Sequence, residues 1–340
     1  MTPPVATLPP AAPTRPASAP LPDAAPTLSA ALATALADGH LPDALSTREP
    51  RDRRDRFLSL LAVYDLWTLP LQELGDAVRL QGSPVLAAVK GRLEAAWMEE
   101  LEASYAAADL PDASTPDGAV AAMRAVAARD RLPAAYRWLA READWPEVVD
   151  FLALEGGPDG GFDDLVAVCQ VGLSGSAKLE LAKNYWDEMG QGDADGVHTT
   201  LYERLVEAIA MPRVPRADLP VEALERAALG GLLATNRWLQ PEMVGALGLL
   251  ELQAGPRCRL VLQAFERLDA PAAAFPFYVE HAEVDPVHGK DWMDKAVVPT
   301  VTERPEWGRR IVQGAYWRST INLAFFEALR RDLESRTVAA

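Results

Sequence analysis

The chain has 340 residues, and 49 acidic against 33 basic side chains give it a net charge of −16 at pH 7. This acidity argues against nucleic-acid binding and against docking on anionic lipid, because both need a basic surface. The two cysteines, Cys169 and Cys258, are too few for a disulfide scaffold or a zinc ribbon. No apolar run is long enough to span a membrane and no secretory signal is recognisable, so we expect a cytoplasmic protein.

The first 28 residues have a composition of their own. Residues 1–28 hold nine of the 28 prolines, mixed with Ala, Thr and Ser. Such a segment cannot bury enough apolar surface to offset the entropy that is lost on ordering. We therefore expect a disordered Pro/Ala-rich tail, with a structured arm that contributes to a dimer as the alternative.

The rest of the chain has the pattern of an all-α protein. Apolar residues recur at spacings of three and four, and no alternating stretch is long enough to predict a strand. We expect an N-terminal helical region over residues 29–130 and a helical core over residues 131–340, which ends in a helix over about residues 314–335. The buried face of that last helix is predicted to carry Ile321, Phe325, Leu329 and Leu333.

Two glutamates fall on helix faces that should be buried. Glu155 continues an apolar stripe at i+7 from Val148, and Glu188 lies at i+7 from Leu181, shortly before Gly190 ends its helix. A charged side chain on a buried face needs a partner or a metal ion. Taken singly, each glutamate is equally well explained as the solvent-facing end of its helix.

Three of the four histidines also lie on inward faces. His198 begins an apolar stripe that continues with Leu201, and alone it is explained as a hydrogen-bonded core residue. His281, Asp285 and His288 lie at i, i+4 and i+7, within an arc of roughly 60° on a helix. Two imidazoles that flank one carboxylate on the same face are typical of a metal site.

One metal cluster would satisfy all these inward polar groups together. Three carboxylates and three imidazoles without a thiolate suit iron or manganese better than copper(I) or structural zinc. Six protein ligands are too many for one catalytic ion with open positions, so we expect two ions that share a carboxylate within a helical bundle. The candidate ligands are Glu155, Glu188, His198, His281, Asp285 and His288.

Three segments resemble the haem-oxygenase-like diiron oxidases, a family of iron-containing redox enzymes. They are FLALEGG around Glu155, YWDEMGQGDADGVHTTLY with Glu188 and His198, and FYVEHAEVDPVHGKDW with the last three candidates. The resemblance covers roughly residues 145–335. It implies a haem-oxygenase-like helical bundle, iron as the metal bound by all six residues, and dioxygen as co-substrate of a centre with two Fe(II) ions. No further catalytic residue is identified.

The resemblance implies an O2-dependent non-haem diiron oxidoreductase. Members of the family oxygenate the nitrogen of amines or guanidines, or cleave C–C bonds in amino acids or fatty acids. We expect N-oxygenation of a small amine or amino-acid-like substrate, with oxidative C–C cleavage as the alternative. A non-catalytic helical binding protein and a single-zinc hydrolase stay open as other classes. An external electron donor and a homodimer are both compatible with this expectation.

Pro286 lies inside the last candidate motif. A proline lacks the N–H that would pair with the Ala282 carbonyl, and its ring clashes there, so the helix is expected to kink or open. We therefore expect this segment to be partly helical and to become ordered on binding iron.

Other residues with reactive or aromatic side chains have a simpler explanation. Cys169 lies in an apolar run and is expected to be an inert core residue rather than a nucleophile. Four aromatic residues near the candidate ligands either line a substrate pocket or belong to the core: Tyr185, Trp186, Tyr278 and Trp292.

Overall fold

The computed structural model describes residues 26–156 and 161–339, with side chains up to residue 332. Within these ranges the structure is all-helical and contains no strand, which confirms the predicted fold class. Most of the predicted N-terminal tail lies outside the described residues. Its last residue does not belong to a tail, because helix α1 begins at Leu28, which is fully buried.

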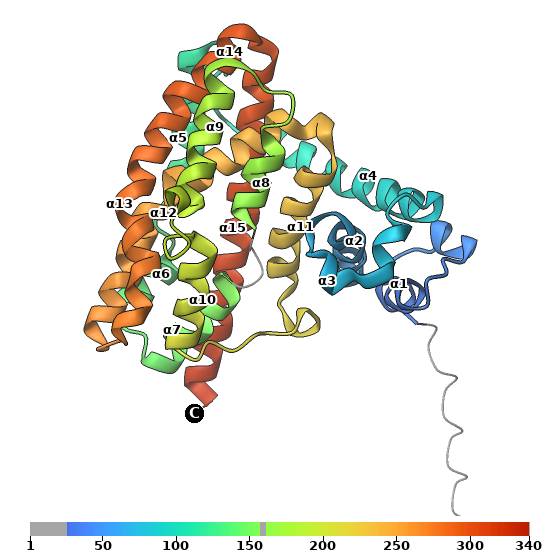
Figure 1. Ribbon diagram of the computed structural model, residues 1–340, viewed down its shortest axis with the longest axis horizontal. Coiled ribbons are helices and arrows are strands. Elements are labelled where there is room, and N and C mark those ends of the chain that lie inside the picture. Colours follow the sequence, from blue (N-terminus) through green and yellow to red (C-terminus); the bar gives the residue numbers. More distant parts are fainter. Residues whose placement is uncertain (1–25, 157–160, 340) are drawn as a thin grey trace, which may run out of the picture.

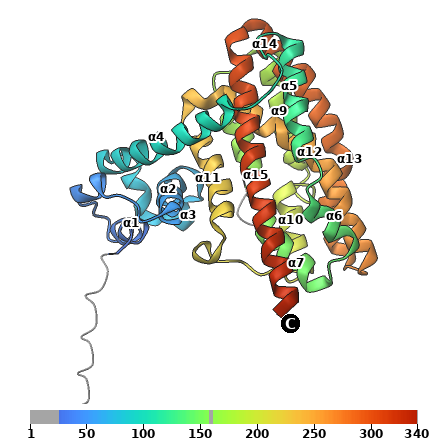
Figure 2. The same cartoon turned by 180° about the vertical axis from the view of Figure 1, so that it is seen from behind.

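Four N-terminal helices form a lobe that projects from one side of the main bundle, next to α11 (Figures 1 and 2). The lobe consists of α1 (Leu28–Ala37), α2 (Arg53–Thr68), α3 (Leu71–Leu74) and α4 (Pro84–Ala106). Helix α5 (Pro116–Arg129) lies within the predicted N-terminal region, yet it packs against α14 and α15 of the bundle.

The remaining helices build the bundle, in which α12 contacts both α13 and α15 along much of its length. Their bounds are α6 Ala134–Arg141, α7 Trp145–Glu155, α8 Phe162–Cys169, α9 Gly175–Glu188, α10 His198–Ala208, α11 Val221–Thr235, α12 Gln240–Arg267, α13 Phe275–Asp291, α14 Val298–Glu303 and α15 Pro305–Ala339. A π-helical segment, Trp292–Val297, joins α13 to α14.

Helix α15 contains the predicted terminal helix but begins nine residues earlier, at Pro305. Ile321, Phe325 and Leu329 are buried as predicted, whereas the side chain of Leu333 lies outside the described part. The helix runs along the length of the bundle (Figure 2). Its buried face packs against α12, the helix that α13 also contacts.

Helix α13 runs without interruption through Pro286, so the expected opening of the helix is wrong. The carbonyl of Ala282, which Pro286 cannot satisfy, accepts a hydrogen bond from Nη1 of Arg259 at 2.7 Å. The proline ring packs against α12 at Gly255, where a Cβ would lie only 3.0 Å from the ring Cδ. Contacts from α12 therefore replace the backbone hydrogen bond that the proline removes. The helix is continuous here, so the expectation that this segment is only partly helical until iron orders it is wrong.

No helix in the described ranges is both long enough and apolar enough to cross a membrane.

Replacing Arg259 tests whether its hydrogen bond to the Ala282 carbonyl stabilises α13 at Pro286. Arg259→Leu leaves the Ala282 carbonyl without its donor, and we expect the free energy of unfolding to fall by about 1–3 kcal/mol. In a Pro286→Ala background the new N–H at position 286 can pair with that carbonyl, so the same substitution should cost much less. Urea unfolding of the four proteins measures this coupling, and equal losses in both backgrounds would contradict the explanation.

Candidate metal centre

The turn between α9 and α10, residues 189–197, brings Glu188 and His198 together. Glu188 is the last residue of α9 and His198 the first of α10, and the backbones of Met189 and Val197 pair between them. Gly190 adopts a φ of +59°, and a Cβ there would lie 2.5 Å from the backbone of the opposite arm. Only glycine fits this position, which gives the Glu-x-Gly pattern a physical reason.

The first group of potential ligands joins α9, α10 and α13. One ligand atom each of Glu188, His198 and His281 lies within 4.8 Å of the others. Nδ1 of His198 is 2.7 Å from Oε2 of Glu188, and the two imidazole rings are 4.5 Å apart between centroids. Glu188 and His198 are each only 5% exposed. These three side chains offer one carboxylate and two imidazoles to a single buried point.

The second group shares Glu188 with the first and adds α12. Ligand atoms of Glu188, Glu251 and His288 again lie within 4.8 Å of one another, and all three residues are buried. Nδ1 of His288 is 3.5 Å from Oε2 of Glu251. The carboxylate of Glu188 therefore lies between two sets of nitrogen and oxygen ligands, as a bridging carboxylate would.

Hydrogen bonds determine which ring nitrogens are available in this centre. Nδ1 of His281 lies 2.7 Å from the carbonyl oxygen of Phe277, to which only a protonated nitrogen can donate. Nε2 of His288 lies 3.0 Å from Oδ2 of Asp187 and donates to it in the same way. In the neutral imidazole each bond directs the lone pair to the other ring nitrogen, which is the arrangement that metal-binding histidines need.

Glu251 is oriented by a neighbour on α9. Its Oε1 accepts a hydrogen bond from Nδ2 of Asn184 at 2.7 Å, which leaves Oε2 facing His288. Asn184 is 1% exposed, so the amide is held within the core. Helix α9 thus supplies one ligand, Glu188, and two side chains that position the ligands of its neighbours, Asn184 and Asp187.

Asp285 belongs to the same buried region, although it is in neither group. The residue is 3% exposed, and its Oδ2 has no hydrogen-bond partner among the described residues. Burial raises the pKa of this carboxyl well above its usual range, and the negative charges of Glu251, Glu188 and Glu280 raise it further. A carboxylate in this position requires a nearby cation to be ionised.

The two α13 histidines experience opposite electrostatic environments. Burial and the neighbouring His198 lower the pKa of His281 to about 4, so its imidazole is neutral. Burial also lowers the pKa of His288, but the carboxylates of Glu251 and Asp187 outweigh it and raise the pKa to about 9. His288 would release a proton on binding a metal ion, because a ligand nitrogen must be unprotonated.

The side chains present fit a pair of iron ions. Nδ1 of His198 and Nδ1 of His288 face the carboxylates of Glu188 and Glu251, and Oδ2 of Asp285 is buried without a hydrogen-bond partner in the described ranges. An unpartnered buried carboxylate oxygen is costly, and a divalent cation would satisfy it. Oxygen and imidazole ligands without a thiolate suit iron or manganese.

Burial raises the pKa of the Cys169 thiol to about 12, in agreement with an inert core cysteine.

Glu155, a predicted ligand, is not brought into either group. Its Oε1 lies 3.1 Å from Nη2 of Arg226, and Nη1 of the same arginine donates to the Glu155 carbonyl at 2.7 Å. Glu251, which the sequence pattern did not single out, lies in the second group of potential ligands. The available signal was one charged residue inside the apolar run of residues 243–252, where a single carboxylate must be buried.

The four aromatic residues considered for a substrate pocket do not line the cleft between α10 and α13. Trp292 is fully buried, and its Nε1 donates to the Val244 carbonyl at 3.1 Å. Tyr278 is 5% exposed and packs against core rings, whereas Trp186 is 53% exposed on the surface. Tyr185 is half-buried. Core packing therefore explains Trp292 and Tyr278.

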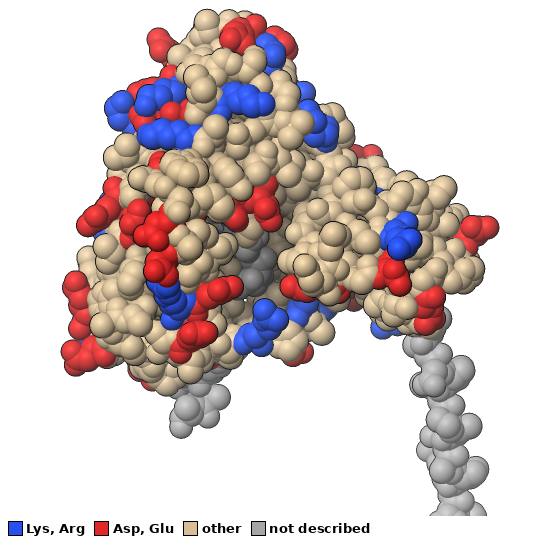
Figure 3. Space-filling view, viewed as in Figure 1, with Lys and Arg blue, Asp and Glu red and all other residues tan. Residues whose placement is uncertain are grey.

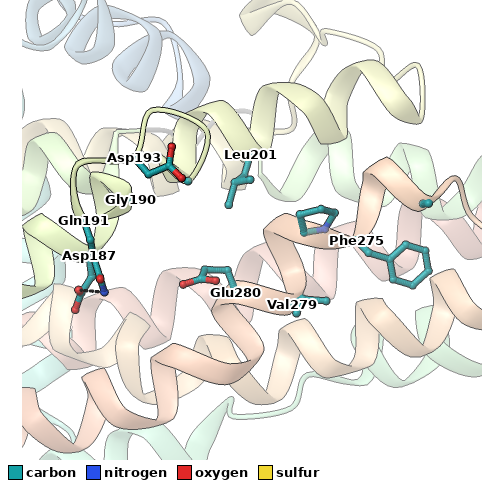
Figure 4. A pocket seen from close by; sticks show the side chains of 11 residues that line it. Asp187, Gly190, Gln191, Asp193, Leu201, Phe275, Val279 and Glu280 are labelled. Atoms are coloured by element: carbon teal, nitrogen blue, oxygen red, sulfur yellow. Dashed lines mark hydrogen bonds between the residues drawn. The ribbon is translucent and has the colours of Figure 1, made fainter.

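A cleft of about 610 Å³ lies between the α9–α10 turn and the first half of α13 (Figure 4). Asp187 and Glu280, the chain neighbours of Glu188 and His281, face it from opposite sides. Gln191 donates a hydrogen bond to Oδ1 of Asp187 at 2.9 Å, so the cleft wall is linked through Asp187 to the centre. The full lining consists of Asp187, Gly190, Gln191, Asp193, Gly196, Leu201, Ala272, Phe275, Pro276, Val279 and Glu280.

The state of His281 can be tested by ¹⁵N NMR of histidine-labelled protein stripped of metal. We expect the neutral Nδ1–H form at pH 7, with protonation only near pH 4. Because this pKa lies below the ordinary 6.5, the unfolded chain binds more protons, and stability should fall as pH drops from about 6.5 towards 4. His281→Gln assigns the signal. Protonation near pH 6.5, or an Nε2–H tautomer, would contradict the geometry.

A comparison with known families agrees with this arrangement. The model of a family described as iron-containing redox enzymes matches residues 150–322, which is more than half of the chain. The match extends from α7 into α15 and includes the six predicted ligands as well as Glu251. A search of curated proteins finds no match. From the family match and the all-helical fold, we conclude that this chain belongs to the haem-oxygenase-like family of iron-containing redox enzymes.

Proposed function

We propose that this protein is an O2-dependent non-haem diiron oxidoreductase that oxygenates the nitrogen of a small cationic amine. The observation that carries this proposal is the shared carboxylate of Glu188, which joins two groups of buried ligands. A single structural ion would not need a second imidazole–carboxylate set beside the first. Iron follows from the family and from the ligand chemistry.

Each group would hold one ion, with Glu188 common to both. His198 and His281 would complete the first site, and Glu251 and His288 the second, with the unpartnered Oδ2 of Asp285 as a further ligand. Two ferrous ions held in this way would supply two electrons to dioxygen. Glu188, Glu251 and Asp285 balance most of the charge of two divalent ions.

The protein's own contribution is orientation. The Phe277 carbonyl, Asp187 and Asn184 each hold one ligand through a hydrogen bond, and these bonds leave a lone pair of that ligand directed at the centre. The bonds that the two histidines donate raise the basicity of their other ring nitrogens, and all three bonds keep the ligands ordered when substrate binds. Asp187 has a second role, because it also contacts Gln191 in the cleft wall.

The cleft favours a positively charged substrate. Three carboxylates line it, those of Asp187, Asp193 and Glu280, and no Lys or Arg is among its described lining residues. Asp and Glu side chains also gather over α10 and the first half of α13 on the lower left of Figure 3. An ammonium or guanidinium group is attracted to such a surface, whereas a free carboxylate is repelled.

The chemistry of the proposed reaction balances with a reductant. The bound ammonium must first release one proton, because only the neutral amine has a lone pair on nitrogen. Conversion of R–NH2 to R–NHOH then consumes one dioxygen, two protons and two electrons and releases one water, so an external electron donor is required. Oxidative C–C cleavage of an amino acid is the second candidate, because such a substrate also carries an ammonium group. A fatty acid has no such group to match the three carboxylates.

Iron content tests the ligand assignment and separates Glu251 from Glu155. After anaerobic loading with Fe(II), we expect two irons in the wild type, fewer in Glu251→Gln, and two in Glu155→Gln, since Glu155 pairs with Arg226. Elemental analysis with circular dichroism as a folding control measures this. Loss of iron in Glu155→Gln but not in Glu251→Gln would reverse the assignment, and no iron in the wild type would favour a binding protein.

Substrate charge is tested with a panel of amines, amino acids and fatty acids, with oxygen uptake by the iron-loaded protein as the measurement. We expect uptake to be stimulated by a cationic amine. Glu280→Gln should then raise KM for that amine several-fold, and added salt should reduce the difference because it screens exposed charges. Glu283→Gln, an exposed neighbour outside the cleft lining, is the matched control. Stimulation by fatty acids alone would contradict the proposal.

A further inference from the structure

A second cavity, partly open to solvent, lies between α8, α11, α12 and α15. Its volume is about 100 Å³, and eight of its nine lining residues have apolar side chains or none. The lining consists of Phe162, Leu165, Leu229, Gly230, Leu233, Ala246, Leu247, Leu250 and Arg318. None of these residues lines the acidic cleft. The protein therefore has two separate cavities of opposite chemical character near one centre.

The size and lining of this cavity suit a small apolar molecule. Apolar cavities of roughly 150 Å³ in proteins take up xenon or benzene. This one is partly open to solvent, so a gas can enter it directly, and Arg318 is its one charged lining residue. A cavity of about 100 Å³ accepts a diatomic gas but is too small for an amine with an organic side group. The cleft of about 610 Å³ has room for such a substrate, so the two reactants would occupy different spaces.

Helix α12 connects the cavity to the metal centre. Leu247 in the cavity wall lies one helical turn before Glu251, so the two side chains are neighbours on the helix surface. Leu250, also in the wall, directly precedes Glu251. The wall of the apolar cavity therefore adjoins, along α12, a carboxylate of the second ligand group, whereas the acidic cleft is lined by no residue of this helix.

Gly230 keeps part of this cavity open. A Cβ added at this position on α11 would meet only Cδ1 of Leu165, at 3.6 Å, which is an ordinary contact. A larger side chain here can extend into the cavity without displacing backbone. The neighbouring Gly231 differs, because a Cβ there would lie 2.3 Å from the ring of Tyr64.

We propose that this apolar cavity is a dioxygen-binding chamber from which the gas reaches the metal centre along the Glu251 side of α12. Gas binding follows from the cavity alone, whereas its role in the reaction rests on the proposed oxygenase function. A separate apolar chamber would allow dioxygen to reach the irons while a cationic substrate occupies the acidic cleft.

The test fills the cavity and follows both gas binding and reaction. Gly230→Ala and Gly230→Leu reduce the volume stepwise, and Gly91→Leu is the matched control, because Gly91 is an exposed helical residue with nothing within 4 Å of an added Cβ. Xenon binding is measured in crystals under xenon pressure. Stopped-flow measurement gives the second-order rate constant for oxidation of the Fe(II)-loaded protein as dioxygen is varied.

We expect xenon in the cavity of the wild type and of Gly91→Leu, and none in Gly230→Leu. The rate constant with dioxygen should fall several-fold in Gly230→Leu, with a smaller fall in Gly230→Ala and two irons retained in both. No xenon in the wild type, or an unchanged rate constant after the cavity is filled, would overturn the proposal. So would a rise in substrate KM without a change in the dioxygen dependence, since the cavity would then hold part of the substrate.

The two proposals fail in different ways. Wild-type protein that binds xenon but neither iron nor dioxygen contradicts the oxygenase function. Wild-type protein that consumes dioxygen but binds no xenon contradicts the cavity proposal and leaves the oxygenase function standing.

Discussion

Concentrated negative charge in the helical interior is the constraint on which the rest of this structure depends. Glu188, Glu251 and Asp285 are all buried at 5% exposure or less, and the charges of the first two raise the pKa of the third. Carboxylates at this density are stable in a core only when a cation or protons neutralise them. The surrounding imidazoles and orienting hydrogen bonds are those of a cation site, which agrees with membership of an iron-containing family.

The fold meets this constraint with contacts that local sequence rules do not describe. Gly190 permits the turn that joins Glu188 to His198. Arg259 and Gly255 on α12 accommodate Pro286, so α13 stays continuous and directs His281 and His288 to the same interior region. Tertiary partners thus determine the geometry of the ligand-bearing helices as much as helix propensity does.

The sequence singled out most residues of the two buried groups because these residues follow helical periodicity. Glu188, His198 and the α13 residues could be recognised from their spacing on inward faces. Glu155 and Glu251 could not be distinguished in this way, because only the fold shows that Arg226 pairs with Glu155 and that Asn184 directs Glu251. The prediction of an open helix at Pro286 was wrong for the same reason. The donor that pairs with the Ala282 carbonyl in place of a backbone N–H is Arg259, which lies on another helix.

Anomalous diffraction at the iron edge from crystals loaded anaerobically with Fe(II) tests the central claim most directly. The account predicts two iron peaks about 3.5–4 Å apart on either side of the Glu188 carboxylate. One should adjoin His198 and His281, and the other Glu251 and His288. A single peak, or two peaks that do not share Glu188, would contradict it.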